Sequence, residues 1–538
     1  MISETKTVAL ETENNQLKQE IIMLSAQVKL LTEQLLLMRQ RQFGRASEKN
    51  ATIISDGQMS LFNEAEQESY VAAFEPELEQ ITYRRRKQRG KRELDLSCLP
   101  VEQIIHELPE DERVCPDCGG ILHACGHDTS RRELTVVPAQ YKVTEHVQTV
   151  YSCRDCERNA AKTPMVKAAV PAPVVRGSGV ASPSLVAHIA NQKYNLALPL
   201  YRQEQEYKRN HINLSRQTMA NWLIFTAENW LEPVYKALKV QFIAGEVAHA
   251  DETVVQVLQE DGKSAESQSY MWLYRTGGDT DRHIILYDYQ PNRKYENPRI
   301  FLDGYNGYLH SDGYEAYHNL PDNITVSGCW AHVRRKFAEI VKSLPDYNRP
   351  GSSAMRGLEF CDRLFALERE FATLPPEHNF KARHEARLHQ SKPVMDEFFD
   401  WLSRLIAPPR TLMGKTISYA LGERPWLEHV LLDGRLELSN NRAERSIKPF
   451  VIGRKSWLFS NTPKGATASA MFYSIIETAK ENRLIPYEYL KFIFEAAPNL
   501  HLSDNPDSAK TLLPWNAPSK CFATAQTDMD NLIPWDEK

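Results

Sequence analysis

The chain of 538 residues lacks the long apolar runs of membrane-spanning proteins. No stretch reaches about eighteen consecutive apolar residues, so we expect no transmembrane helix. The first residues are polar and acidic and show no signal-peptide pattern, so we expect a cytoplasmic protein.

Positive charge is not in excess either. The chain has 65 Lys and Arg against 70 Asp and Glu, which gives a formal net charge of −5. This balance excludes a surface that binds nucleic acid everywhere, so any contact with DNA requires local basic patches. Hydrophobic residues make up 42% of the chain and charged residues 25%, which is typical of folded protein. The length predicts roughly three or four domains.

Cysteines are few, and their odd number, nine, argues against a disulfide framework. Four of them form two Cys-x-x-Cys pairs that are separated by 34 residues: Cys115, Cys118, Cys153 and Cys156. A Cys-x-x-Cys turn lets two thiolates bind one tetrahedral ion. We therefore predict one structural Zn²⁺ in a zinc ribbon over 106–165, with strands such as 141–147. The alternatives are a redox dithiol, idle thiols, or substitute ligands from nearby positions: Cys125, His123 and His127.

Heptad spacing predicts a coiled coil over 1–45. Apolar residues recur every seventh position at Leu10, Leu17, Leu24, Leu31 and Met38. The positions three residues earlier include Asn14, Ile21 and Val28. Leu at d with β-branched residues at a favours a two-stranded parallel coil, and an Asn at a fixes its register. We therefore predict a homodimer or higher oligomer; the alternative is an amphipathic helix that packs on the chain's own core.

A basic cluster follows an acidic one in a charged linker predicted over 46–105. Residues 64–79 are rich in Glu, and the stretch 84–92 begins with Arg84, Arg85, Arg86 and Lys87. One interpretation is a solvated linker with blocks of opposite charge, and the other is an arm that contacts DNA phosphates. The two are compatible, because a flexible basic linker is able to contact phosphates.

A helix-turn-helix is predicted over 180–240, after a linker rich in Pro and Gly. The expected helices cover 184–192, 198–210 and 214–223. Ser215 is the expected N-cap of the last helix. Its outward side chains, suited to phosphates or base edges, are Arg216, Gln217 and Asn221, and its inward ones are Met219 and Trp222. The alternative is a helical pair with no role in DNA binding.

Strands and helices alternate after Gly245. The expected strands are 246–258, 270–275, 283–289, 308–311 and 324–329, followed by a helix over 331–342. Asp251 lies on the first strand and Asp312 directly after the fourth. This order is that of an RNase H-like α/β domain, in which these two strands are neighbours. Asp303 is the nearest competing acid, but it precedes Gly304 and is predicted to be a turn residue.

A third acid, Glu444, follows Asp312 by 132 residues, whereas Asp312 follows Asp251 by only 61. The long second interval predicts a helical insertion at about 345–432 in a catalytic domain over 245–465. Three carboxylates have no reason to converge unless cations neutralise them. Two hard cations about 3.5–4 Å apart do so, and they clamp the attacking and leaving oxygens of a phosphodiester.

The sequences around these acids resemble the DDE triad of bacterial insertion-sequence transposases, and they are most similar to the insertion sequence 66 family. The segments are His249-Ala250-Asp251-Glu252-Thr253, His310-Ser311-Asp312-Gly313-Tyr314 and Asn440-Asn441-Arg442-Ala443-Glu444-Arg445. The resemblance spans nearly the whole chain, from the zipper to the C-terminal helices. It implies a DNA transposase that cleaves the ends of its own element and joins the 3′ ends to target DNA. Its catalytic and metal-binding residues would be Asp251, Asp312 and Glu444, with two Mg²⁺ or Mn²⁺ and with small accessory proteins as further partners.

Basic and polar side chains near the acids are predicted to contact DNA: His332, Arg334, Arg335, Asn441, Lys448, Arg454 and Lys455. Asn441, Glu444 and Lys448 share one helix face. The segment 329–337 also resembles the family's segment after the second aspartate. Its alternative interpretation is a strand-to-helix junction with Cys329 and Phe337 in the core.

The chain as a whole is predicted to be a multidomain α+β protein with C-terminal helices over 466–482 and 486–496. A disordered tail is expected over 501–538, where two Pro-Trp segments, at 512–515 and 532–535, are the alternative docking elements. Two other functions stay open: a DNA-binding regulator with an inactive nuclease domain, and an RNase H-like nuclease that cuts without joining.

Overall fold

A computed structural model describes residues 140–159, 165–373, 379–502 and 504–522, and only isolated positions before residue 140. The predicted coiled coil, the basic arm and the first cysteine pair, Cys115 and Cys118, lie outside the described residues. The chain divides into two compact units, and the described parts fall at 140–171 in one and 172–522 in the other. No helix among these residues is long and apolar enough to cross a membrane.

The smaller unit contains a short antiparallel ribbon. Strands β1 (Val150–Ser152) and β2 (Met165–Lys167) pair along their length, and helix α3 (Arg154–Asn159) lies between them in sequence. Cys153 directly follows β1. The prediction of a strand at 141–147 is wrong, because these residues take no strand conformation. They have no partner strand among the described residues to hold them in a ladder.

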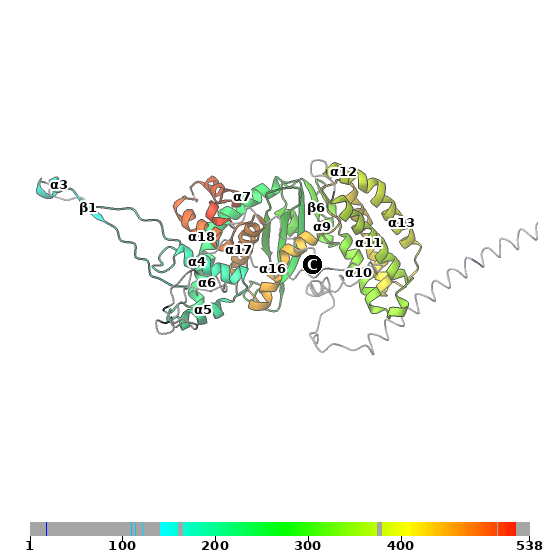
Figure 1. The fold of residues 1–538 in the computed structure, drawn as a ribbon, viewed down its shortest axis with the longest axis horizontal. Coiled ribbons are helices and arrows are strands. Elements are labelled where there is room, and N and C mark those ends of the chain that lie inside the picture. Colours follow the sequence, from blue (N-terminus) through cyan, green and yellow to red (C-terminus); the bar gives the residue numbers. More distant parts are fainter. Residues whose placement is uncertain are drawn as a thin grey trace, which may run out of the picture. The chain divides into compact units, whose positions relative to one another are not determined.

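A mixed five-stranded sheet forms the centre of the larger unit (Figure 1). Its strands are β3 (Val247–Gln256), β4 (Gln268–Thr276), β5 (Ile285–Gln290), β6 (Gly307–His310) and β7 (Ile324–Ser327). Their order is β5-β4-β3-β6-β7, with β3, β4 and β5 antiparallel and β3, β6 and β7 parallel. This topology is consistent with the predicted RNase H-like core. The two parallel connections run through helices α8 (Glu296–Phe301) and α9 (Glu315–His318).

Helix α17 (Pro463–Glu481) covers the edge strand β5. The backbone N–H of Ile285 donates to Thr478 Oγ1 at 2.9 Å, and the N–H of Tyr287 donates to Ser474 Oγ at 2.7 Å. Hydroxyl side chains on the helix therefore satisfy backbone donors that a further strand would otherwise take. An edge that is covered in this way is not free to pair with another chain.

The predicted insertion lies between β7 and helix α16 (Asn441–Trp457). It follows helix α10 (Trp330–Ser343) and consists of helices, listed in chain order: α11 (Ser353–Phe371), α12 (Asn379–Ala386), α13 (Lys392–Ser403), α14 (Leu412–Gly422) and α15 (Arg424–Glu428). It shares an aromatic core with α10, in which Trp330 and Phe337 of α10, Phe360 of α11 and Phe398 of α13 are all buried. In Figure 1 these helices lie on the far side of the sheet from α17.

The predicted helix-turn-helix is present as helices, but it is not a separate body. Its helices are α4 (Pro183–Ala190), α5 (Leu200–Arg209), α6 (Arg216–Thr226) and α7 (Glu232–Ile243). As predicted, Ser215 caps α6 by accepting the N–H of Thr218, and Met219 and Trp222 are buried. Helix α6 packs on α17, and α4 packs on the C-terminal helix α18 (Pro486–Ala496). This module is thus continuous with the catalytic unit.

The prediction of a disordered tail is wrong for residues 504–522. They form short 3-10 turns in which Leu512 and Leu513 are buried. Tyr489 donates its hydroxyl to the carbonyl of Leu512 at 2.7 Å, and the N–H of Ile485 donates to the carbonyl of Cys521 at 2.8 Å. The Pro-Trp segment at 512–515 therefore docks on its own chain, whereas 532–535 lies outside the described residues.

Candidate active site

Two of the predicted acids belong to neighbouring strands of the sheet, Asp251 on β3 and Asp312 just after the end of β6. His249 on β3 is opposite His310 on β6, and their rings stack with centroids 4.5 Å apart. Asp251 and Asp312 each follow these histidines by two residues. Strand β6 ends at His310, so Asp312 lies in the following loop, where its Oδ1 accepts the N–H of Tyr314 at 3.1 Å. The parallel pairing thus brings the two aspartates to adjacent positions.

Glu444 lies in the first turn of α16, and the start of this helix is fixed to β3. The preceding residue, Asn440, is buried and makes two contacts with that strand. Its Nδ2 donates to the carbonyl of Ala250 at 2.8 Å, and its Oδ1 lies 3.0 Å from Nδ1 of His249. Because both contacts are to the residues directly before Asp251 on β3, they hold the start of α16 close to Asp251.

The acidic side chains interact electrostatically with one another. Burial raises the pKa of Asp251 well above its ordinary value, and the negative charges of Glu252, Asp312 and Glu444 raise it further. The N–H of Glu252 donates to Asp251 Oδ1 at 2.8 Å and offsets only part of this cost. The three predicted acids therefore form one cluster that is unfavourable without positive charge. Their donors are all carboxylate oxygens, which fit hard divalent cations such as Mg²⁺ and Mn²⁺.

Glu252, the neighbour of Asp251, has its own partners. Arg293 Nε donates to its Oε1 at 2.9 Å, and the Tyr317 hydroxyl donates to its Oε2 at 2.6 Å. Burial and the charge of Asp312 raise the pKa of Glu252 to about 7, while Arg293 and Tyr317 oppose that rise. Both carboxylate oxygens of Glu252 are therefore already engaged with partners from the protein.

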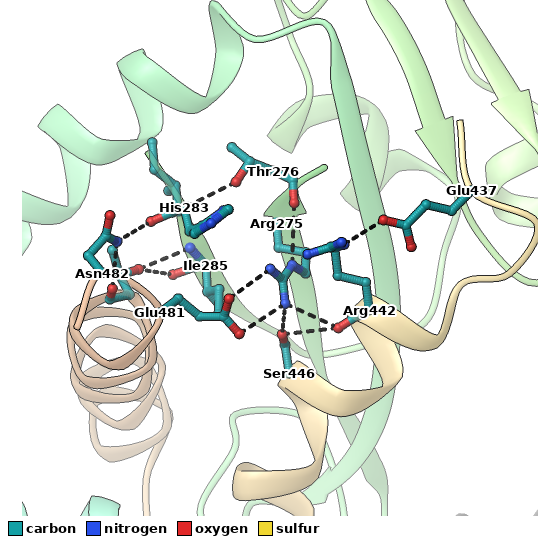
Figure 2. Close-up of polar contacts among 11 residues, drawn as sticks. Arg275, Thr276, His283, Ile285, Glu437, Arg442, Ser446, Glu481 and Asn482 are labelled. Carbon is teal, nitrogen blue, oxygen red and sulfur yellow. Dashed lines mark hydrogen bonds and ion pairs between the residues drawn. The ribbon is translucent and has the colours of Figure 1, made fainter. Parts of the chain in front are cut away.

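A buried arginine network holds α16 through further contacts (Figure 2). Arg275 on β4 is 1% exposed, and it donates to Ser446 Oγ at 2.5 Å and to Glu481 Oε2 at 3.2 Å. Its NH1 also donates to the carbonyl of Arg442 at 3.3 Å, and Arg442 Nε donates to Glu437 Oε1 at 2.7 Å. Through these bonds β4, α16 and α17 share one polar cluster. It fixes the helix that carries Glu444.

A cysteine and a histidine adjoin Glu444 from α10. The potential ligand atoms of Cys329, His332 and Glu444 all lie within 4.8 Å of one another. His332 Nε2 is 3.8 Å from Glu444 Oε1, and Arg335 NH2 is 3.4 Å from Glu444 Oε2. Burial lowers the pKa of His332, but Cys329, Glu444 and Asp312 raise it by more, to about 10. The negative groups around His332 thus favour a positive charge at this place in the site.

The other residues predicted to contact DNA differ in accessibility. Arg216, Gln217 and Asn221 are exposed on α6, where Gln217 Nε2 donates to Asn221 Oδ1 at 3.2 Å. Lys455 near the end of α16 is also exposed, whereas Asn441, Lys448 and Arg454 are half-buried. Arg334 pairs with Asp362 at 2.6 Å, and His332 is 9% exposed, so neither presents an open face to DNA in this state. The competing acid, Asp303, lies exposed in a turn before Gly304, as predicted.

Sequence patterns did not identify the residues that position the site. Asn440, Arg275 and the Cys329–His332 pair act through contacts between elements that are far apart in the chain. The only local signals were the doubled Asn before α16 and the Cys-x-x-His spacing at the start of α10. Arg275 lies in an apolar strand, where a charged residue is rarely buried without a partner, and that signal was overlooked.

A mixed five-stranded sheet with acids near one another on β3, in the loop after β6 and on α16 is consistent with the core of a DDE or RNase H-like enzyme. Residues 178–468 match the transposase IS66 family, and 112–157 match the zinc-finger binding domain of transposase IS66. Residues 474–515 match the IS66 C-terminal element, and 30–104 match a segment described as transposase C of IS166 homeodomain. The chain therefore belongs to the IS66 transposase family, a family of DDE enzymes, and the predicted resemblance is confirmed. A DDE domain implies divalent metal ions, the zinc-finger domain suggests zinc, and the family implies DNA binding.

Similar proteins occur in Sinorhizobium fredii. The uncharacterized protein y4hP is 30% identical over 435 residues, which are 77% of this chain and 74% of that protein. The uncharacterized protein y4qI is 29% identical over 509 residues, which are 90% of this chain and 88% of that protein. The similarity to y4qI thus extends over most of both chains.

Proposed function

We propose that this enzyme binds the ends of its own insertion sequence, cleaves a phosphodiester at each 3′ end and joins the freed 3′ hydroxyls to target DNA. The observation that carries the proposal is the burial of Asp251 next to the negative charges of Glu252, Asp312 and Glu444, which together raise its pKa and favour bound cations. The rival functions lack such support. A regulator with an inactive nuclease domain has no reason to keep three acids together, and a nuclease that only cuts does not account for the match to a transposase family.

In the proposed mechanism the chain supplies a rigid frame for three carboxylates. Asp251 is held by β3, Asp312 by the loop after β6, and Glu444 by a helix that Asn440 fixes to β3. Two Mg²⁺ or Mn²⁺, when bound by these three residues, would supply the positive charge that activates water or a 3′ hydroxyl and stabilises the leaving oxygen. In-line attack by water cleaves the 3′ end of the element, and in-line attack by the new 3′ hydroxyl joins it to target DNA.

DNA would be held by surfaces around this frame. On this proposal, the element end is bound by α6, where Arg216, Gln217 and Asn221 contact base edges or phosphates. Phosphates beside the cations would be held by side chains near the acids: Arg335, Asn441, Lys448, Arg454 and Lys455. The buried His332 and the Asp362-paired Arg334 are left out of this set. The basic arm Arg84, Arg85, Arg86 and Lys87 would add sequence-independent affinity. Small accessory proteins of the same element remain proposed partners.

The deciding experiment is a strand-transfer assay with a labelled DNA fragment that carries a candidate element end, and a plasmid as target. Joined product supports the proposal. Cleavage without joining would instead support the nuclease, and binding without cleavage in Mg²⁺ or Mn²⁺ would support the regulator.

The zinc ribbon is expected to retain about one Zn²⁺ per chain through purification without chelator, since structural sites of this kind bind with about 10–16 kcal/mol. The proposed ligands are Cys115, Cys118, Cys153 and Cys156. Elemental analysis measures the zinc content. Replacing Cys115 and Cys118 by Ser should remove this ion, and the same zinc content in that variant would rule out the assignment.

The N-terminal segment is expected to join two chains. Replacing Leu17 and Leu24 by Lys puts like charges into the predicted apolar seam and should separate the protomers. Analytical ultracentrifugation should then give half the wild-type mass, and coordinated cleavage of paired ends should fall while binding of single ends persists. The matched control replaces Lys18 and Lys29, which lie outside the heptad stripe, by Glu. An unchanged mass in the Leu variant would refute the coiled coil as the assembly device.

A further inference from the structure

Three side chains of different chemistry meet beside the acidic triad. Cys329 is the N-cap of α10, His332 lies in the first turn of this helix, and Glu444 comes from α16. Their sulfur, nitrogen and oxygen atoms lie within 4.8 Å of one another, the one such metal-ligand group among the described residues. The acidic triad does not meet this condition.

The donor set differs in kind from that of the triad. A thiolate, an imidazole and a carboxylate are the ligands that Zn²⁺ and related ions prefer, whereas Mg²⁺ prefers oxygen alone. Three protein ligands with a fourth position left for water is a common arrangement for zinc. Cys329 Sγ also accepts the backbone N–H of Asn440 at 3.1 Å, and such an outer contact orients a thiolate ligand.

Two polar atoms in this cluster are buried and have no hydrogen-bond partner among the described residues. They are His332 Nδ1 and Glu444 Oε1. Glu444 Oε2 faces Arg335, while Oε1 is 3.8 Å from His332 Nε2, which is too long for a hydrogen bond. Buried atoms without partners are costly, so the cluster is better explained as a set of ligands than as a finished ion pair.

We propose that Cys329, His332 and Glu444 form a binding site for one Zn²⁺-class ion, distinct from the zinc ribbon and from the acidic triad. The site shares Glu444 with the triad. An ion bound there would withdraw Glu444 from the hard cations and inhibit DNA cleavage. The inhibition of DNA cleavage rests on the proposed function, whereas the binding of zinc does not.

Zinc binding is tested on the full chain by equilibrium dialysis against micromolar Zn²⁺, followed by elemental analysis. All proteins carry Asp251→Asn, so that an extra ion does not depend on an intact triad. The parent is expected to bind one equivalent more than the same protein with Cys329→Ser, and one more than with His332→Gln. The His332→Gln variant keeps the Cys329–Asn440 hydrogen bond, so a loss of zinc in this variant is not explained by the loss of that contact. Equal zinc contents in the parent and both variants would overturn the proposal.

Cys361 provides a matched control. It is fully buried in α11, like Cys329 near α10, but it belongs to no such cluster. Cys361→Ala should keep the extra equivalent, and its loss in that variant would show that the extra zinc is bound elsewhere or depends on general packing, against the proposal.

The shared ligand is tested by inhibition in proteins that retain Asp251. Each protein is assayed for cleavage in Mg²⁺ with increasing Zn²⁺, relative to its own activity without zinc. At least tenfold more Zn²⁺ should be needed for half-inhibition of Cys329→Ser than of wild type. Equal sensitivity would refute the inhibitory role, and absence of cleavage in all proteins without zinc would instead count against the proposed function.

Discussion

Asp251→Asn is expected to lower the rate of DNA-end cleavage by roughly a thousandfold or more, because a carboxylate that holds the cations is lost. A thousandfold loss corresponds to about 4 kcal/mol of transition-state stabilisation. Binding to the element end should persist, since the exposed residues of α6 are untouched. A gel-based cleavage assay and a binding assay on the same labelled fragment measure both quantities.

Asp303→Asn is the matched control. It makes the same chemical change in the same domain, but at an exposed turn residue away from the cluster. This variant should cleave at the wild-type rate. Wild-type cleavage by Asp251→Asn, or an equal loss in both variants, would remove Asp251 from the catalytic assignment.

The positions of the strands along the chain, and of Asp251 and Asp312 relative to them, were predictable because they follow from local patterns. An apolar run predicts β3, and a short strand followed by Asp-Gly predicts the end of β6. The parallel register then places the two aspartates together. The family resemblance added Glu444, whose distance of 132 residues from Asp312 gives no physical signal of proximity by itself.

The precise placement of Glu444 was not predictable, because it depends on contacts between distant segments. Asn440 binds β3 across 190 residues, and Arg275 binds Ser446 across 171. No periodicity links such pairs. The prediction of a disordered tail was wrong for a related reason. Residues 504–522 are polar overall, but a few apolar side chains, Leu512 and Leu513 among them, are enough to pack this segment against α18.

The insertion is also attached to the active site by one buried side chain, Arg387. Its side chain is 0% exposed, and it donates to both oxygens of Glu368, at 2.6 and 2.8 Å. It also donates to the carbonyls of Val430, Asp433 and Leu436, at 3.1, 3.1 and 2.7 Å. These carbonyls belong to the segment that leads into α16. All the donor directions of the guanidinium are thereby used.

Arg387→Met is therefore expected to destabilise the larger unit by about 3–5 kcal/mol, because it leaves buried acceptors without their donor. Methionine keeps much of the side-chain length, so the decrease in the free energy of unfolding reflects lost hydrogen bonds and charge more than lost volume. The midpoint of urea unfolding, followed by tryptophan fluorescence, should fall accordingly. Cleavage should fall as well at temperatures where the variant is still folded, since the segment before Glu444 loses its anchor.

Arg363→Met is the control for this change. Arg363 also lies in the helical region and pairs with Glu397 at 3.4 Å, but both side chains are more than half exposed. Exposed pairs of this kind contribute about 1 kcal/mol or less, so the midpoint should hardly move. Equal shifts in the two variants would mean that the contacts of Arg387 do not hold the insertion to the segment before α16. A large shift for Arg387→Met alone, with cleavage reduced in the folded variant, would show that the insertion supports the position of Glu444.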